Sequence, residues 1–156
     1  MLFRSPFLIK GGIALAEGIG EKLTKLPDFP DCVLVIAKPD LGVSTKEVYE
    51  AFDSLKEVNH PDIGKLVRTL GSASLKEIVK LLGNVLEEVT AKKYEIIDIV
   101  KNLMLKSGTV FSMMTGSGPT VFGIFENEEQ AKKACNNLRK QEGLELVAIA
   151  KCYTGQ

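Results

Sequence analysis

Tryptophan is absent from this 156-residue chain, histidine occurs once and cysteine only three times. The single histidine, His60, precedes Pro61 in a polar segment, so it should be an exposed turn residue with no metal cluster around it. The cysteines, Cys32, Cys135 and Cys152, are odd in number and far apart, a spacing that fits neither a zinc site nor a redox motif. Two of them lie in apolar runs, where a free cysteine packs as a small hydrophobic residue. We therefore expect buried, inert thiols and no metal site.

An excess of charge and a long apolar run are also missing. Twenty basic and 20 acidic residues give a net charge of zero, which excludes a strong overall attraction to nucleic acid or to an anionic membrane. No run approaches the roughly 20 apolar residues that a membrane-spanning helix needs. The first residues also lack the charged start, apolar run and cleavage site of a signal peptide. We expect a cytoplasmic protein.

The remaining pattern is that of a globular domain, with hydrophobic residues making up 45% of the chain. Apolar runs bounded by glycine or proline predict strands at 7–10, 13–17, 21–26, 32–37, 109–113, 120–125 and 144–152. Helical periodicity predicts helices at 44–55, 61–70, 74–82, 84–106 and 127–141. Ser44 and Glu47 have the spacing of a capping box at the start of the first helix. This order of elements predicts an α+β fold.

A glycine-rich turn lies between the strands expected at 109–113 and 120–125. It contains Thr115, Gly116, Ser117 and Gly118, and the two glycines let the backbone approach a ligand closely. Consecutive N–H groups in such a turn can form a concave site for an anion. The segment matches neither the P-loop pattern nor the dinucleotide fingerprint. Two interpretations stay open: a plain β-hairpin connection, or a loop that faces a phosphate.

The segment from Met114 to Phe122 resembles the third conserved motif of the GHMP kinases, a superfamily that includes galactokinase, homoserine kinase and mevalonate kinase. Further blocks at 6–12, 16–21, 35–49 and 83–87 resemble, in the same order, the 4-diphosphocytidyl-2-C-methyl-D-erythritol kinase family. The resemblance covers nearly the whole chain. Val85 departs from it, because the family usually has an aspartate there.

The resemblance implies a GHMP-kinase carboxy-terminal domain at 27–156, with a ferredoxin-like antiparallel sheet and helices on one face. Residues 1–26 would be strands that normally belong to an amino-terminal kinase domain, which is missing here. The implied complete enzyme uses ATP and Mg²⁺ to phosphorylate the 2-hydroxyl of 4-diphosphocytidyl-2-C-methyl-D-erythritol in non-mevalonate isoprenoid biosynthesis. The chain would then be the substrate-side half, with the amino-terminal domain and this substrate as its partners.

The resemblance also assigns site residues. It places no catalytic residue in this chain, because Arg4 stands where the family has the aspartate that acts as general base, and an arginine cannot accept a proton at neutral pH. It places Thr45 next to the methylerythritol end of the substrate, although Thr45 could equally be only the start of a helix. Thr115, Gly116, Ser117 and Gly118 would lie near the transferred phosphate.

Three expectations follow for the chain by itself. It should be inactive as a kinase, it should bind neither ATP nor Mg²⁺, and its unpaired strand edges should favour self-association. Two other functions remain as alternatives: a fragment of another GHMP kinase of the homoserine or mevalonate type, or a non-catalytic ferredoxin-like module that binds a small ligand or a protein. The run Pro39 to Thr45, with its Gly-Val-Ser-Thr ending, favours the first assignment over both.

Overall fold

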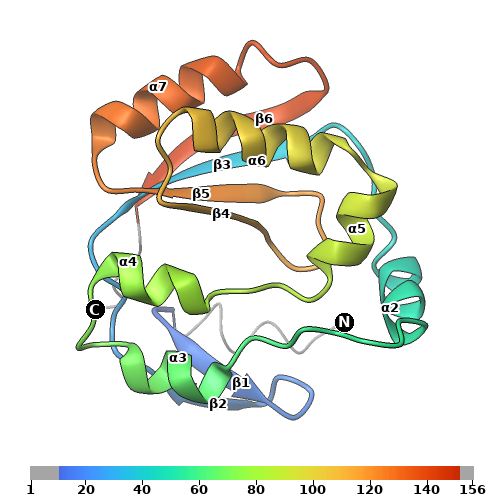
Figure 1. Cartoon of the computed structure of the whole chain (residues 1–156), viewed down its shortest axis with the longest axis vertical. Coiled ribbons are helices and arrows are strands. Elements are labelled where there is room, and N and C mark those ends of the chain that lie inside the picture. The colour runs from blue at the N-terminus through green and yellow to red at the C-terminus, as the bar shows by residue number, and fades with distance from the viewer. Residues whose placement is uncertain (1–10, 152–156) are drawn as a thin grey trace. The chain divides into compact units, whose positions relative to one another are not determined.

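The computed structural model of the chain describes residues 11–151 (Figure 1). The strand expected at 7–10, together with Arg4 and Cys152, lies outside these residues. The described residues divide into two units, one formed by 11–31 with 62–81 and the other by 32–61 with 82–151. Each unit is described by itself below.

The first unit contains a β-hairpin and short helices. Strands β1 (Ala14–Glu17) and β2 (Lys22–Lys25) pair antiparallel, with Ala14 opposite Lys25, which confirms the two strands expected here. The helical part comprises α3 (Ile63–Thr69), α4 (Leu75–Ile78) and the 3₁₀ turn η1 (Val79–Leu81).

Side-chain caps start both helices of this unit. Asp62 accepts a hydrogen bond of 2.8 Å from the Lys65 amide, and the Ser74 amide donates one of 2.9 Å to Glu77. The helix expected at 74–82 is thus a shorter α-helix that continues as a 3₁₀ turn. Residues 62–81 group with the hairpin, so the unit boundary differs from the division expected at residue 26, and the assignment of 1–26 to a kinase domain stays a prediction.

The second unit is an antiparallel four-stranded sheet with helices packed on it. Its strands, in spatial order, are β4 (Phe111–Met114), β5 (Val121–Phe125), β3 (Val33–Pro39) and β6 (Leu144–Lys151). Its helices are α2 (Thr45–Asp53), α5 (Glu87–Lys93), α6 (Ile96–Lys106) and α7 (Glu128–Leu138). The first strand in the chain lies between the third and the fourth, and helices connect the first to the second and the third to the fourth. This is the ferredoxin-like arrangement, so the predicted α+β fold is confirmed.

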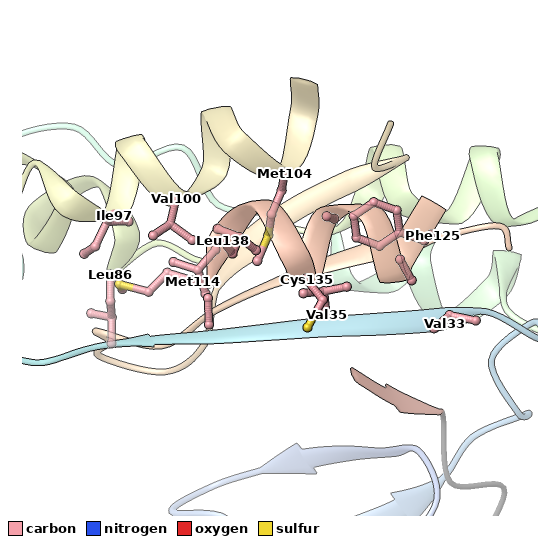
Figure 2. Close-up of a cluster of buried hydrophobic side chains, with 14 of the residues drawn as sticks. Val33, Val35, Leu86, Ile97, Val100, Met104, Met114, Phe125, Cys135 and Leu138 are labelled. Atoms are coloured by element: carbon pink, nitrogen blue, oxygen red, sulfur yellow. The ribbon is translucent and has the colours of Figure 1, made fainter. Parts of the chain in front are cut away.

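One face of the sheet carries the core. Strand β3 alternates, with Val33, Val35 and Ala37 buried, as expected for residues that point to the same side. Helix α7 packs against β3 and β6, and α6 packs against β4 and β5 (Figure 1). Figure 2 shows the side chains that meet between these layers, among them Phe125 from β5 and Leu138 from α7, both fully buried. The expectation of helices on one face of the sheet is confirmed.

The long helix expected at 84–106 is wrong, because two helices occupy that stretch. Helix α5 ends at Lys93, and Tyr94 takes an extended backbone conformation before α6 starts at Ile96. An unbroken helix would place Lys92 and Lys93 on the same stripe as Val89 and Ile96, so it would direct two charges into the apolar face. The break leaves both lysines exposed while Ile97 is fully buried.

Candidate functional site

The glycine-rich segment connects β4 to β5 as a hairpin loop. The Thr115 amide donates a hydrogen bond of 2.8 Å to the Thr120 carbonyl, and the Gly118 amide donates one of 3.0 Å to the Thr115 carbonyl. Gly116 and Gly118 have φ angles of 58° and 85°, a region that residues with a Cβ rarely adopt. The hairpin interpretation is therefore correct for the backbone, and the ligand-facing interpretation depends on what surrounds the loop.

Thr45 lies beside this loop. It is the first residue of α2, whose N-cap, Ser44, accepts a hydrogen bond of 3.3 Å from the Glu47 amide. The Thr45 and Ser117 hydroxyl oxygens are 3.0 Å apart, so either can donate to the other. The structure thus brings together the two separate segments that the sequence singled out. Only half of the expected capping box forms, because the Glu47 carboxylate instead accepts from the Lys93 ammonium at 2.8 Å.

Asn84, three residues before α5, and Thr90, within α5, hold the loop from the other side. The Asn84 amide group donates to the carbonyls of Met114 and Gly116, both at 2.8 Å, and its own carbonyl accepts from the Leu86 amide at 3.1 Å. Thr90, only 1% exposed, donates to the Ser117 carbonyl at 3.2 Å. Sequence reasoning did not assign either residue to the site. The available signal was Thr90, a polar residue on the same helical face as the apolar Leu86, four positions before it.

These contacts engage the hydrogen-bond acceptors of the loop but leave some of its donors available. The carbonyls of Met114, Gly116 and Ser117 accept hydrogen bonds from Asn84 and Thr90, whereas the Gly116 and Ser117 amides donate to no group that the structure describes. The exposed Thr45 hydroxyl and the half-buried Ser117 hydroxyl lie beside them. The loop therefore offers a small cluster of donors with its acceptors tied back, an arrangement that suits an anion.

A cavity of about 290 Å³ lies next to this cluster. Residues of α2 and α5 line it, including Ser44, Val48, Val89 and Thr90. Thr90 therefore contributes both to the cavity wall and to the hold on the loop.

An ion pair between Glu47 and Lys93 also lines the cavity. The hydrogen bond and charge of Lys93 lower the pKa of Glu47, and the hydrogen bond to Glu47 raises the pKa of Lys93. The Lys93 ammonium also lies 5.4 Å from the centre of the Tyr94 ring. On the same helix as Glu47, Tyr49 comes one turn after Thr45, and 48% of its surface is exposed.

Cys32 and Cys135 are both buried, as predicted. No group of histidine, cysteine or acidic residues within 11–151 is arranged to hold a metal ion. In the same stretch, every helix is too short or too polar to cross a bilayer.

Comparison with curated proteins identifies relatives over most of the chain. A 4-diphosphocytidyl-2-C-methyl-D-erythritol kinase of Lachnospira eligens is 47% identical over 138 residues, which are 88% of this chain and 48% of that protein. The protein of the same name from Clostridium acetobutylicum is 45% identical over 136 residues, 87% of this chain and 49% of its own length. The chain thus spans about half the length of the curated relatives it matches.

Solved structures give the same result for the fold. A crystal structure of 4-(cytidine 5'-diphospho)-2C-methyl-D-erythritol kinase matches 94% of this chain and 52% of its own with a TM-score of 0.74 and 25% identity. Homoserine kinase from Cytophaga hutchinsonii matches 97% of this chain and 51% of its own with a TM-score of 0.71 and 20% identity, a similarity of fold. The family model described as "GHMP kinases C terminal" matches residues 66–143. With the ferredoxin-like sheet and the glycine loop in place, the chain belongs to the GHMP kinase family and comprises its carboxy-terminal domain.

Proposed function

We infer that this chain is the substrate-side half of a kinase that transfers phosphate from ATP to the 2-hydroxyl of 4-diphosphocytidyl-2-C-methyl-D-erythritol. The observation that carries this proposal is the 3.0 Å contact between the Thr45 and Ser117 hydroxyls, which joins the helix α2 start to the glycine loop. The names of the relatives at 45–47% identity support this substrate. The homoserine and mevalonate kinases that match at 20% and 12% identity support the fold alone.

The donors of the site fit phosphate oxygens. Phosphoryl transfer relies mainly on positioning and on stabilising charge on the phosphoryl oxygens, and ATP with its Mg²⁺ supplies the group that is transferred. In this chain the Thr45 hydroxyl would orient the acceptor alcohol, while the Ser117 hydroxyl and the Gly116 and Ser117 amides would face the phosphate. Tying the loop carbonyls to Asn84 and Thr90 removes acceptors that would repel an anion.

The same donor cluster does not fit Mg²⁺, which prefers carboxylate oxygens and water. Neither Thr45 nor Ser117 has a carboxylate among its hydrogen-bond partners in the described part of the chain. We therefore assign no Mg²⁺ ligand and no general base to this cluster. Both would come from the amino-terminal half, in keeping with the coverage of about half of each relative.

Tyr49 extends the proposed substrate surface. Its exposed ring lies one turn after Thr45 on α2, so a substrate bound at Thr45 could reach it. Nucleobases stack on exposed aromatic rings, and such stacking contributes about 1–3 kcal/mol per base. We assign to Tyr49 a contact with the base of the substrate.

Joining the chain to the amino-terminal half of the Lachnospira eligens relative tests the proposal. The hybrid should phosphorylate 4-diphosphocytidyl-2-C-methyl-D-erythritol with ATP, and homoserine and mevalonate should be poor substrates. The 156-residue chain alone should show no turnover. A substrate bound without a nucleotide or a base positioned beside it loses the about 7–11 kcal/mol by which correct positioning of the reacting groups can lower the barrier. Preference of the hybrid for homoserine or mevalonate would reassign the substrate, and a properly folded hybrid with no kinase activity would favour a non-catalytic binding module.

A further inference from the structure

Strand β4 forms one edge of the four-stranded sheet, and the glycine loop begins where this strand ends. The Thr115 amide points toward β5, because it donates to the Thr120 carbonyl. Neighbouring residues of a strand direct their backbone groups to opposite sides. The amide and carbonyl of Met114 therefore face the outer edge, where no further strand within residues 11–151 pairs with them.

Two side chains satisfy the backbone groups of this edge, one from the first residue of α5 and one from the segment just before it. Asn84 donates to the Met114 carbonyl at 2.8 Å, and the Glu87 carboxylate accepts from the Met114 amide at 2.5 Å. Asn84 lies three positions before Glu87, the first residue of α5, so both side chains reach the strand edge from the same end of the helix. Together they make the hydrogen bonds that a neighbouring strand would make to Met114, the residue just before the glycine loop.

Glu87 is itself held in place. Its second carboxylate oxygen pairs with the ammonium of Lys101, which comes from α6. Only 17% of the Glu87 side chain and 24% of the Lys101 side chain are exposed, so this pair is far more buried than the neighbouring pair of Glu88 with Lys92, which is 53% and 66% exposed. A partly buried carboxylate with both oxygens engaged is held in one orientation more firmly than a carboxylate in an exposed ion pair.

We propose that Glu87, held by Lys101, is a positioning residue that anchors the glycine loop through the Met114 amide. This inference rests on the proposed function for its effect on catalysis, but the anchoring itself concerns only contacts within this chain. The anchor fixes the backbone from which Gly116 and Ser117 present their amides, so its loss should change turnover more than it changes substrate binding at Thr45.

Two matched double variants distinguish the effect of the hydrogen bond to the Met114 amide from the effect of the Glu87–Lys101 ion pair. Glu87→Leu with Lys101→Met removes the ion pair and the acceptor, whereas Glu87→Gln with Lys101→Met removes the ion pair but keeps an acceptor for Met114. In the 156-residue chain, amide hydrogen exchange at Thr115 and Gly118 should become about tenfold faster in the leucine variant than in the glutamine variant, which is the effect of one lost hydrogen bond. Glu88→Leu with Lys92→Met is the control and should leave both amides unchanged.

Glu87→Asp provides a second, milder variant in case the leucine variant does not fold. It keeps the charge but shortens the side chain by one methylene, so the carboxylate withdraws from Met114. Exchange at Thr115 and Gly118 should again accelerate. Equal protection in the leucine and glutamine variants, or wild-type protection in Glu87→Asp, would overturn the proposal.

The hybrid kinase gives the functional readout. There Glu87→Asp should lower kcat by about 10- to 100-fold with little change in KM, because a small misplacement of positioning groups acts on the transition state. A rise in KM with unchanged kcat would contradict the assigned role. If the wild-type hybrid has no activity, the proposed function fails, while the exchange measurements still decide whether Glu87 anchors the loop.

Discussion

The hydroxyl of Thr45 lies 3.0 Å from the hydroxyl of Ser117, although 72 positions separate the two residues in the sequence. One hydroxyl starts a helix and the other lies in a turn between two strands. Helix α2 already has its cap from Ser44, so this contact is not needed to start the helix. Under the proposed function, both hydroxyls would lie beside the same bound substrate.

The first prediction concerns this hydroxyl pair. In the hybrid kinase, Ser117→Ala should lower kcat/KM by about 10- to 100-fold, because a hydrogen bond to a charged group contributes about 1.5–3 kcal/mol. Thr45→Val should lower kcat/KM by about 2- to 10-fold, because a hydrogen bond to a neutral alcohol contributes about 0.5–1.5 kcal/mol. The unfolding midpoint should change little, since Thr45 is exposed and Ser117 only half-buried. Thr45→Ser keeps the hydroxyl and should retain most of the activity. Full activity in both Thr45→Val and Ser117→Ala would show that this hydroxyl pair is not part of the site.

The second prediction compares the two glycines of the loop. Alanine at either position strains a positive φ, which costs about 1–2 kcal/mol. At Gly118 the new Cβ would also lie 2.5 Å from the Met114 sulfur and 3.3 Å from a Thr90 methyl, whereas at Gly116 it would meet nothing within 4 Å. Because Met114 is fully buried, this clash should cost about 1–3 kcal/mol more.

Urea unfolding of Gly116→Ala and Gly118→Ala tests this difference. Gly118→Ala should have the clearly lower free energy of unfolding. Equal losses in the two variants would show that Met114 can move aside and that only backbone strain matters at these positions.

The third prediction is that the stability of the folded chain depends on pH through the ion pair of Glu47 with Lys93. The pKa of Glu47 is lowered from 4.5, so its contribution to stability is present above that value and is lost as the pH falls through the folded-state pKa. The pKa of Lys93 is raised from 10.5, so its contribution is present below that value and is lost as the pH rises through the folded-state pKa. At neutral pH both contributions are present.

Lys93→Met should therefore lower the urea midpoint slightly at pH 7, and the difference from wild type should disappear well below pH 4.5. Because both groups are exposed, raised salt should also reduce the difference at pH 7. A difference that persists unchanged in acid would mean that Lys93 acts through packing on Tyr94 rather than through its charge.

The fourth prediction concerns self-association of the 156-residue chain. Among the described strands, β1 and β2 pair only with each other, and a two-stranded sheet leaves both of its outer edges free to pair. Light scattering after size-exclusion chromatography should show a mass that rises with concentration. Ile19, 69% exposed in the hairpin turn, offers a variant: Ile19→Lys should reduce association, whereas Ile99→Lys on α6 should not. A monodisperse monomer at high concentration would contradict the prediction.

Much of the fold could be predicted because local patterns determine it. The apolar run of β3 and the cap at Ser44 predicted elements whose bounds agree with the structure to within a few residues. The prediction of a single helix across Tyr94 was wrong. The apolar residues before and after Tyr94 fit one continuous helical period, and only the cost of burying Lys92 and Lys93 favoured a break.

The sequence indicated some residues of the candidate site but not the side-chain contacts that hold the glycine loop. Glycine spacing and the helix start identified Ser117 and Thr45. The family resemblance implied that Thr45 lies beside the substrate and that the loop with Ser117 lies near the transferred phosphate. The roles of Asn84, Thr90 and Glu87 depend on side chains reaching backbone groups about 30 positions away, as the separations of 30, 27 and 27 show. Such contacts leave no local periodicity, so they became visible only in the folded chain.

The antiparallel pairing of β3 with β5 has a consequence for how the site forms. Ala37 lies opposite Val121, so this pairing brings the segment leading to Thr45 alongside the strand that leaves the glycine loop. The β4–β5 hairpin is local and can form early, but without β3 it presents Ser117 with no Thr45 beside it. A phosphate compound that contacts both hydroxyls would therefore bind only the chain with its sheet fully assembled, and its concentration would shift the folding equilibrium toward that state.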